Sequence, residues 1–160
     1  MKKYLLGIAT GLLLTLGTIT NINAIRTMEG EKFFRNGCKA LMYDQPGIAI
    51  TEYEKAIEKG IEKPELYNFL GEAYQQQKNI EKAAYWFFMA LDVSPNNPSA
   101  YANLTELAIQ FDNPNESLKF ALKLQETNKD PHNNLEFLLG HAYRLNHNLK
   151  KNITSFSKNT

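Results

Sequence analysis

Aromatic, leucine, small and proline residues recur in this chain with a period of 34 residues, which limits the folds it can adopt. The clearest unit runs from Pro64 to Asn97 and carries Tyr67, Leu70, Gly71 and Tyr74 at repeat positions 4, 7, 8 and 11, and Ala83, Phe87, Ala90 and Pro95 at positions 20, 24, 27 and 32. The first four positions have helical spacing, so they share one face of a helix. Pro95 ends a second helix because it cannot donate the helical hydrogen bond. We therefore predict stacked units of two helices each.

The same pattern appears when the sequence is shifted by 34 residues in either direction. Residues 30–63 keep a glycine, an alanine and an aromatic residue at positions 8, 20 and 24, namely Gly37, Ala49 and Tyr53. Residues 98–132 are more degenerate, because Thr105 replaces the glycine and Ala121 stands where a large residue is expected. A fourth unit, residues 133–160, keeps Gly140 at position 8 and Phe156 at position 24 but stops short of the full length.

The segments between the two helices of each unit support this period independently. Repeat positions 15 to 17 read Asp44-Gln45-Pro46, Lys78-Asn79-Ile80, Asp112-Asn113-Pro114 and His147-Asn148-Leu149. Asp and Asn are favoured as helix caps, and Pro is favoured at the first helical position. We predict a turn at each of these four places.

The spaced Tyr67, Leu70-Gly71, Tyr74, Ala83, Phe87, Ala90 and Pro95 resemble the consensus of the tetratricopeptide repeat (TPR) family. The resemblance implies an all-α fold, a right-handed α-solenoid of antiparallel helix pairs, with about three full repeats and a truncated fourth. We expect about seven helices and no strand. Gly71 and Ala83 are small enough for the two helices of a hairpin to approach closely, and Phe87 is expected to fill the space between this hairpin and the next.

The resemblance also implies a concave groove for a partner, lined by positions 2, 5, 9, 12 and 13 of each first helix. The predicted groove residues are Phe34, Leu41, Asn68, Glu72, Gln75, Gln76, Glu106, Ile109, Gln110, Phe137, His141 and Arg144. The middle of this set is polar and mildly acidic, and its ends are more apolar. It suits an extended peptide or a helix with a basic or polar centre and apolar flanks. The alternative is that these positions form an ordinary solvated surface.

Family members that hold acidic chaperone tails use a two-carboxylate clamp, which needs a lysine and an asparagine at positions 5 and 9 of the first unit. Phe34 and Cys38 occupy those positions here. We therefore expect no such clamp.

Residues 1–24 have the three parts of a secretory signal peptide. Lys2 and Lys3 precede an uncharged apolar stretch, and a polar segment ends at Ala24, where cleavage is expected. The alternative is an uncleaved membrane anchor over residues 4–20, which is short for a bilayer span. Both hypotheses place the body outside the cytoplasmic membrane, periplasmic or secreted after cleavage and otherwise anchored. Residues 25–29 are expected to be a linker to a repeat domain over residues 30–160.

Composition and motifs argue against catalysis and nucleic-acid binding. The net charge is +1 and only three of the 18 cationic residues are arginines, so no basic face is expected. Cys38 is the single cysteine, the three histidines are dispersed, and no glycine-rich phosphate loop occurs. We expect no cofactor, no metal and no enzymatic activity. The leading hypothesis is a protein-binding adaptor, scaffold or assembly factor. The alternative is a structural subunit of a larger envelope complex that docks or self-associates through its edges or convex face.

Overall fold

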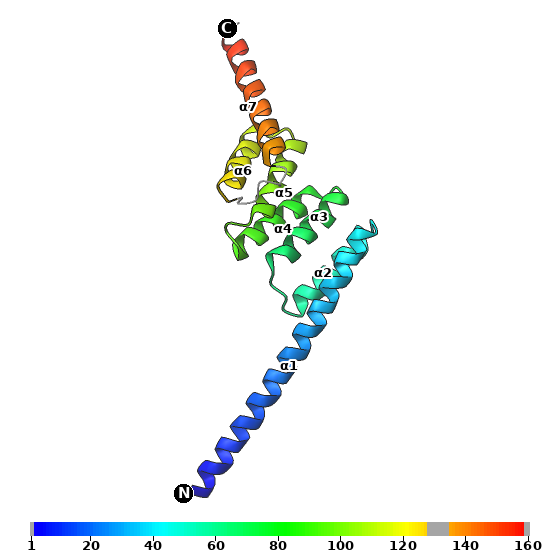
Figure 1. The fold of residues 1–160 in the computed structure, drawn as a ribbon, viewed down its shortest axis with the longest axis vertical. Coiled ribbons are helices and arrows are strands. Elements are labelled where there is room, and N and C mark those ends of the chain that lie inside the picture. Colours follow the sequence, from blue (N-terminus) through cyan, green and yellow to red (C-terminus); the bar gives the residue numbers. More distant parts are fainter. Residues whose placement is uncertain (1, 128–134, 159–160) are drawn as a thin grey trace. The chain divides into compact units, whose positions relative to one another are not determined.

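The computed structural model describes residues 2–127 and 135–158, with side chains placed for residues 21–127 and 135–150. Within these ranges the chain forms helices and no strand (Figure 1). The seven helices are α1 (Lys2–Met42), α2 (Pro46–Glu58), α3 (Pro64–Gln76), α4 (Ile80–Val93), α5 (Pro98–Gln110), α6 (Pro114–Thr127) and α7 (Leu135–Lys158). The predicted all-α fold of helix pairs is confirmed. None of the helices has, over its described residues, the length and apolar character needed to cross a membrane.

The chain divides into two compact units, residues 1–62 and residues 63–160. In the first unit α2 runs back along the C-terminal part of α1 (Figure 1). The expected linker at residues 25–29 lies inside α1, so that expectation is wrong. The segment contains no proline or glycine to interrupt the backbone hydrogen bonds, and its side chains are all exposed, so the helix continues through it.

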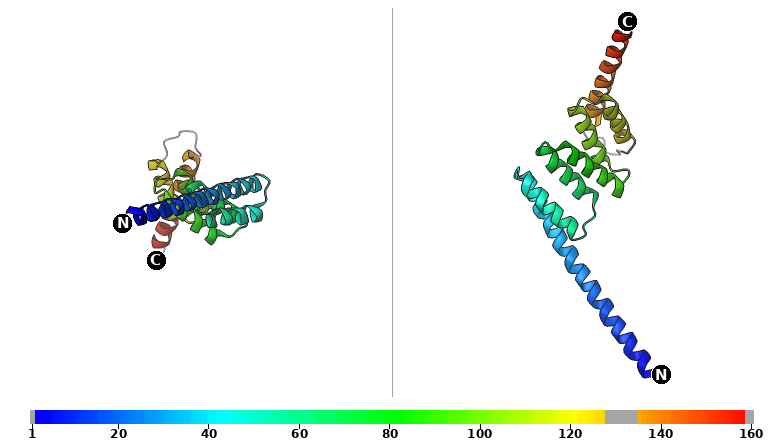
Figure 2. Two further views of the ribbon diagram at one scale, coloured as in Figure 1. Left: turned by 90° about the horizontal axis from the view of Figure 1, so that it is seen from below. Right: turned by 180° about the vertical axis from the view of Figure 1, so that it is seen from behind.

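In the second unit the helices pair as the repeat predicts. Helix α3 packs against α4, and α5 packs against α6. The first helices also contact each other along the stack, α3 with α5 and α5 with α7. Figure 2 shows the same succession of pairs from two further directions, with α7 continuing beyond α5 and α6.

Each hairpin is closed by a matched pair at repeat positions 8 and 24. A Cβ built on Gly71 would lie 2.4 Å from the ring of Phe87, and one on Gly37 would lie 2.4 Å from the ring of Tyr53. In the α5–α6 hairpin the sizes are exchanged, since Thr105 and Ala121 occupy these positions and both are fully buried. The Thr105 hydroxyl donates to the Tyr101 carbonyl at 2.7 Å, so its burial leaves no polar group unpaired. The degenerate third repeat is therefore compensated within its own hairpin.

Three of the four predicted turns are present and share one geometry. Asp44, Lys78 and Asp112 have φ values of 55°, 59° and 48°, the left-handed conformation that ends a helix. At the second turn the Asn79 amide donates to the Tyr74 carbonyl and the Lys78 amide to the Gln75 carbonyl, which satisfies the last carbonyls of α3. The cap of the next helix comes from the following residue. Asn79 accepts from the Lys82 amide and Asn113 from the Glu116 amide, whereas Gln45 makes no side-chain cap.

The fourth predicted turn, at residues 147–149, is wrong, because α7 is continuous from Leu135 to Lys158. Position 20 of the other three units holds Ala49, Ala83 and Ser117, all fully buried where two helices touch. The fourth unit has the larger Asn152 there, which a close helix contact would have to bury unpaired. In keeping with this, a Cβ on Gly140 would have nothing within 4 Å.

Candidate functional site

A polar groove lies between the first helices of the second and third repeats. It encloses a cavity of about 590 Å³ and is lined by Glu72, Gln75, Gln76, Lys78, Asn103, Glu106 and Gln110. The first four of these residues come from α3 and the turn that follows it, and the other three come from α5. The two sets therefore lie on facing stripes of neighbouring helices. Five of these seven positions belong to the groove predicted from the sequence.

Side-chain hydrogen bonds connect the two helices across the floor of this groove. The Asn103 amide donates to Glu72 Oε1 at 3.2 Å, and the Gln75 amide donates to Gln110 Oε1 at 3.2 Å. Each bond joins residues in adjacent repeats, so the groove is held in shape by the same groups that line it. A ligand that binds here meets groups that are already oriented.

The Glu72 carboxylate is the electrostatic centre of the groove. Burial raises its pKa above the ordinary value, the hydrogen bond from Asn103 opposes that rise, and the nearby charge of Glu106 adds to it. Two carboxylates and one ammonium group, that of Lys78, line the cavity, so its formal charge is negative. A cationic group entering the groove would relieve the repulsion between Glu72 and Glu106.

Asn68 has a different position from the one expected. It is 4% exposed, and its amide donates to Asn97 Oδ1, the oxygen that also caps α5 by accepting from the Ala100 amide. Its own Oδ1 is buried and accepts no hydrogen bond from the described residues. Asn68 therefore fixes the start of α5 instead of presenting a surface to the groove.

The other predicted residues are dispersed. Phe34 and Leu41 lie in the first unit, where Phe34 packs on Tyr53 with ring centroids 6.0 Å apart. Ile109 is half-buried on α5 outside the cavity lining. Phe137, His141 and Arg144 lie on α7, where the Phe137 and His141 rings meet edge to face at 5.8 Å and Phe137 is 63% exposed.

Two lining residues, Asn103 and Lys78, were not predicted. Asn103 is at repeat position 6, one residue outside the expected stripe, and it reaches the groove because it bonds to Glu72. Lys78 is the left-handed residue of the α3–α4 turn, so a helical stripe does not include it. The signal in the sequence that could have included Lys78 is its place in the turn that directly follows α3.

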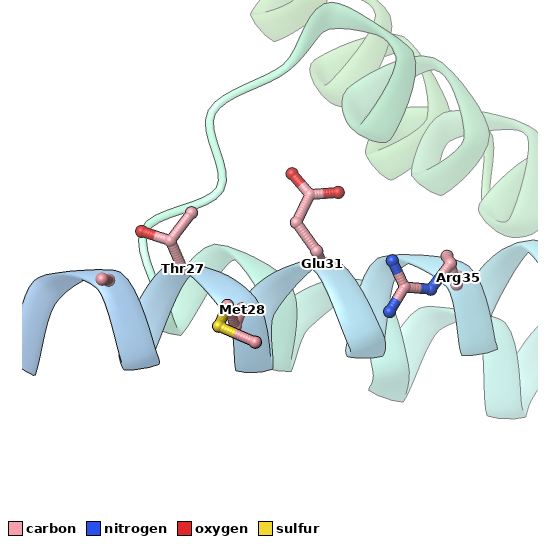
Figure 3. A pocket seen from close by; sticks show the side chains of 5 residues that line it. Thr27, Met28, Glu31 and Arg35 are labelled. Carbon is pink, nitrogen blue, oxygen red and sulfur yellow. The ribbon is translucent and has the colours of Figure 1, made fainter.

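A second hollow, of about 480 Å³, lies along α1 and is lined by Ala24, Thr27, Met28, Glu31 and Arg35. All five residues come from α1, and no other described element lines the hollow. Figure 3 shows Thr27 and Glu31 pointing to one side of α1 and Met28 to another. Groups that diverge in this way do not form a binding site.

An apolar hollow of about 220 Å³ lies between α4, α5 and α6, and its lining includes Phe88, Phe111 and Phe120. Phe88 is 47% exposed and Phe111 is 57% exposed. Tyr85 and Val93 add further exposed apolar surface on α4. Helix α4 therefore exposes three large apolar side chains, of which Phe88 faces α6 with its ring centroid 6.0 Å from that of Phe120.

Among the described residues, no group of three or more His, Cys, Asp or Glu is placed to hold a metal ion. The arrangement of helix hairpins, first-helix groove and paired position-8 and position-24 residues defines the TPR class of fold. No protein-family model and no curated protein sequence matches the chain.

Solved TPR domains share this fold. The Sgt2 TPR domain from Aspergillus fumigatus superimposes with a TM-score of 0.71 at 19% identity, over 77% of this chain and 82% of that one. The TPR2B domain of yeast Sti1, solved as a complex with pHsp70, gives a TM-score of 0.67 at 16% identity, over 73% and 98% of the two chains. The first TPR of Spaghetti (RPAP3), bound to the HSP90 peptide SRMEEVD, gives a TM-score of 0.67 at 17% identity, over 78% of this chain and 98% of that one. The chain thus has the fold of TPR domains.

Proposed function

We propose that this chain is a non-catalytic protein-binding module that receives a partner segment carrying lysine or arginine in the groove between α3 and α5. The observation that carries the proposal is the pair of carboxylates, Glu72 and Glu106, set among amides in a cavity of about 590 Å³. Hydrogen-bonding amides suit a peptide backbone, and the carboxylates select a cationic side chain.

The solved TPR domains support peptide binding by this fold. The charge of one bound peptide, compared with the charge of the groove in this chain, indicates a different ligand preference. The heptapeptide bound to the RPAP3 domain, SRMEEVD, carries three acidic side chains. A groove lined by Glu72 and Glu106 would repel such a segment. Position 5 and position 9 of the first repeat, Phe34 and Cys38, also lack the lysine and asparagine expected of an acidic-tail clamp. We infer the opposite charge preference.

Two fluorescent heptapeptides test this preference directly by anisotropy titration of the full chain. One is SRMEEVD, and the other is SRMKKVK, in which lysines replace the acidic residues. We expect tighter binding of SRMKKVK, with an affinity that falls as salt is added because the attraction is between charges. Equal binding of the two peptides would contradict the proposal.

Charge-neutralising variants locate the binding to the groove. Glu72→Gln and Glu106→Gln should each weaken SRMKKVK binding by up to about five-fold, since a partly exposed ion pair contributes about 0–1 kcal/mol. Glu81→Gln is the matched control, because it removes the same charge from an exposed site on α4. A loss with Glu81→Gln equal to that with Glu72→Gln would place the binding elsewhere.

A second candidate function is that of a structural subunit that docks through its second helices. The exposed Tyr85, Phe88 and Val93 on α4 favour it, since large exposed apolar side chains are typical of interaction sites. Phe88→Ser should then abolish incorporation into the assembly while leaving SRMKKVK binding intact. Co-purification of tagged wild-type and variant chains from the source cells measures this.

We also propose that the module acts outside the cytoplasmic membrane. The support is the sequence of residues 1–24, with Lys2 and Lys3 before an uncharged apolar stretch and Ala24 at the expected cleavage site.

A further inference from the structure

The outer face of α7 carries a symmetric set of residues around Gly140. Glu136 and Arg144 lie four residues before and after Gly140, and Phe137 and Tyr143 lie three residues before and after it. All five are exposed, with Phe137 at 63% and Tyr143 at 51%. Opposite charges and paired aromatic residues are therefore arranged about a glycine at the centre of one helix face.

This face lies opposite the side by which α7 joins the stack. Leu138, Ala142 and Asn146 recur every four residues and are 5%, 0% and 8% exposed. The Asn146 amide donates to Asn115 Oδ1 at 3.4 Å, so the inner side is fastened to α6. At 100° per residue, Gly140 points about 160° away from both Leu138 and Ala142. The outer face is free to contact another molecule without disturbing the inner one.

In the complete repeats the position-8 face is covered by the second helix of the same unit. Tyr67 and Tyr74, which lie four residues before and three after Gly71, are 5% and 6% exposed because α4 covers them. Helix α7 has the same glycine, but among the described residues no helix covers this face, and a Cβ at Gly140 would meet nothing within 4 Å. The outer face of α7 thus resembles a helix face of a hairpin whose partner helix is not among the described residues.

We propose that this face pairs with the α7 face of a second copy of the chain, in an antiparallel crossing centred on Gly140. In such a pair a residue n places before Gly140 is level with the residue n places after it in the second copy. Glu136 then lies level with Arg144 of the second copy and Phe137 with Tyr143, and two-fold symmetry repeats both pairs. The glycines let the two helix axes approach closely at the crossing.

Charge complementarity selects this occupant. A helix face with Glu136 at one end and Arg144 at the other is complementary to itself only when reversed, and it opposes like charges in a parallel pair. A single helix pair buries less than the roughly 1,200 Å² of a stable complex, so the dimer is weak and depends on concentration. It does not rest on the proposed peptide groove, because it is assayed with no peptide present.

Sedimentation velocity of the full chain from about 10 µM to about 1 mM tests the pairing, a range suited to a weak dimer. We expect reversible dimerisation. Glu136→Arg should weaken it at least five-fold, since two attractive pairs become repulsive, and adding Arg144→Glu should restore it by reversing both partners. A wild-type chain that stays monomeric, or a double variant no tighter than the single one, would overturn the proposal.

Gly140→Leu gives an independent test with a built-in folding control. Within one chain the new side chain enters open space, so helix content by circular dichroism should be unchanged or slightly higher. At the crossing it separates the two helices, and the dimer should be lost. Dimerisation of Gly140→Leu at wild-type strength would show that the contact is not centred on Gly140.

Discussion

At the scale of single residues, the contact between Gly71 and Phe87 determines how closely α3 and α4 approach. The Phe87 ring, itself fully buried, occupies the space that a side chain at position 71 would need. Protein interiors are close-packed, so added atoms at such a contact force the neighbours to move.

Gly71→Leu should lower the free energy of unfolding by about 1–3 kcal/mol, the usual cost of overpacking a core. Thermal denaturation followed by circular dichroism measures the loss. Gly140→Ala is the matched control, because its Cβ meets nothing and alanine favours helix by about 1 kcal/mol over glycine. If Gly71→Leu melted at the wild-type temperature, the close contact between α3 and α4 would be wrong.

The Thr105–Ala121 pair predicts how overpacking at the contact between positions 8 and 24 can be relieved. Gly71→Thr should destabilise the chain, and the added Phe87→Ala should recover part of the loss by reproducing the pair that the third repeat uses. A double-mutant cycle, measured by chemical denaturation, gives the coupling free energy between positions 71 and 87. Additive losses in the double variant would mean that positions 8 and 24 do not compensate each other.

The raised pKa of Glu72 has a consequence for stability. Its carboxyl binds a proton more tightly in the folded chain than in the unfolded one, so its contribution to stability falls as pH rises from the unfolded pKa through the folded one. Glu72→Gln should therefore stabilise the chain at neutral pH. The difference in the free energy of unfolding between variant and wild type should vanish when the pH is below the pKa of Glu72 in the unfolded chain. Denaturation curves at several pH values test this, and a gain that persists at low pH would contradict it.

At the scale of elements, the turns inside the hairpins repeat one geometry with three different sequences. Two of the left-handed residues, Asp44 and Asp112, are aspartates, which tolerate this conformation well. The third, Lys78, is a lysine, which adopts it less readily. The backbone at Lys78 is therefore held in place by the helices on either side of the turn.

Lys78→Asn should raise the free energy of unfolding by about 0.5–1 kcal/mol, since asparagine adopts positive φ more readily than lysine. Lys119→Asn is the matched control, because Lys119 is exposed within α6 and asparagine is a poorer helix former there. Chemical denaturation compares the two variants. Destabilisation by Lys78→Asn would show that the lysine side chain contributes more than the backbone conformation costs.

At the scale of the whole molecule, the chain consists of two compact units, and the first of them includes the N-terminal part of α1. Residues 2–24 form part of α1, and the sequence of residues 1–24 predicts cleavage after Ala24. Mass spectrometry of the protein from its source cells should find a chain that begins at Ile25, or failing that an intact chain in the membrane fraction. A soluble cytoplasmic chain that retains Met1 would contradict the proposed export.

The sequence alone determined the hairpins, and it placed five of the residues that line the polar groove on one stripe of the first helices. The two helices of a unit are joined by a short turn, and their contact residues, such as Gly71 and Phe87, fall in one 34-residue period. Local spacing was therefore enough to predict the pairing and the small residue at the contact, whereas Phe87, expected between this hairpin and the next, meets Gly71 inside its own hairpin. The period places Glu72 and Glu106 at one position of adjacent first helices, and the resemblance to TPR proteins implied that this position lines the groove.

Only the tertiary structure decided what happens between repeats and at the end of the stack. The burial of Asn68 against Asn97, and the entry of Asn103 into the groove, depend on side chains 29 and 31 residues apart that meet only when the units stack. The fourth turn was predicted from His147-Asn148-Leu149, yet α7 continues through these residues. A helix folds back only when its return buries an apolar face, and the polar residues after Leu149 offer too little to bury.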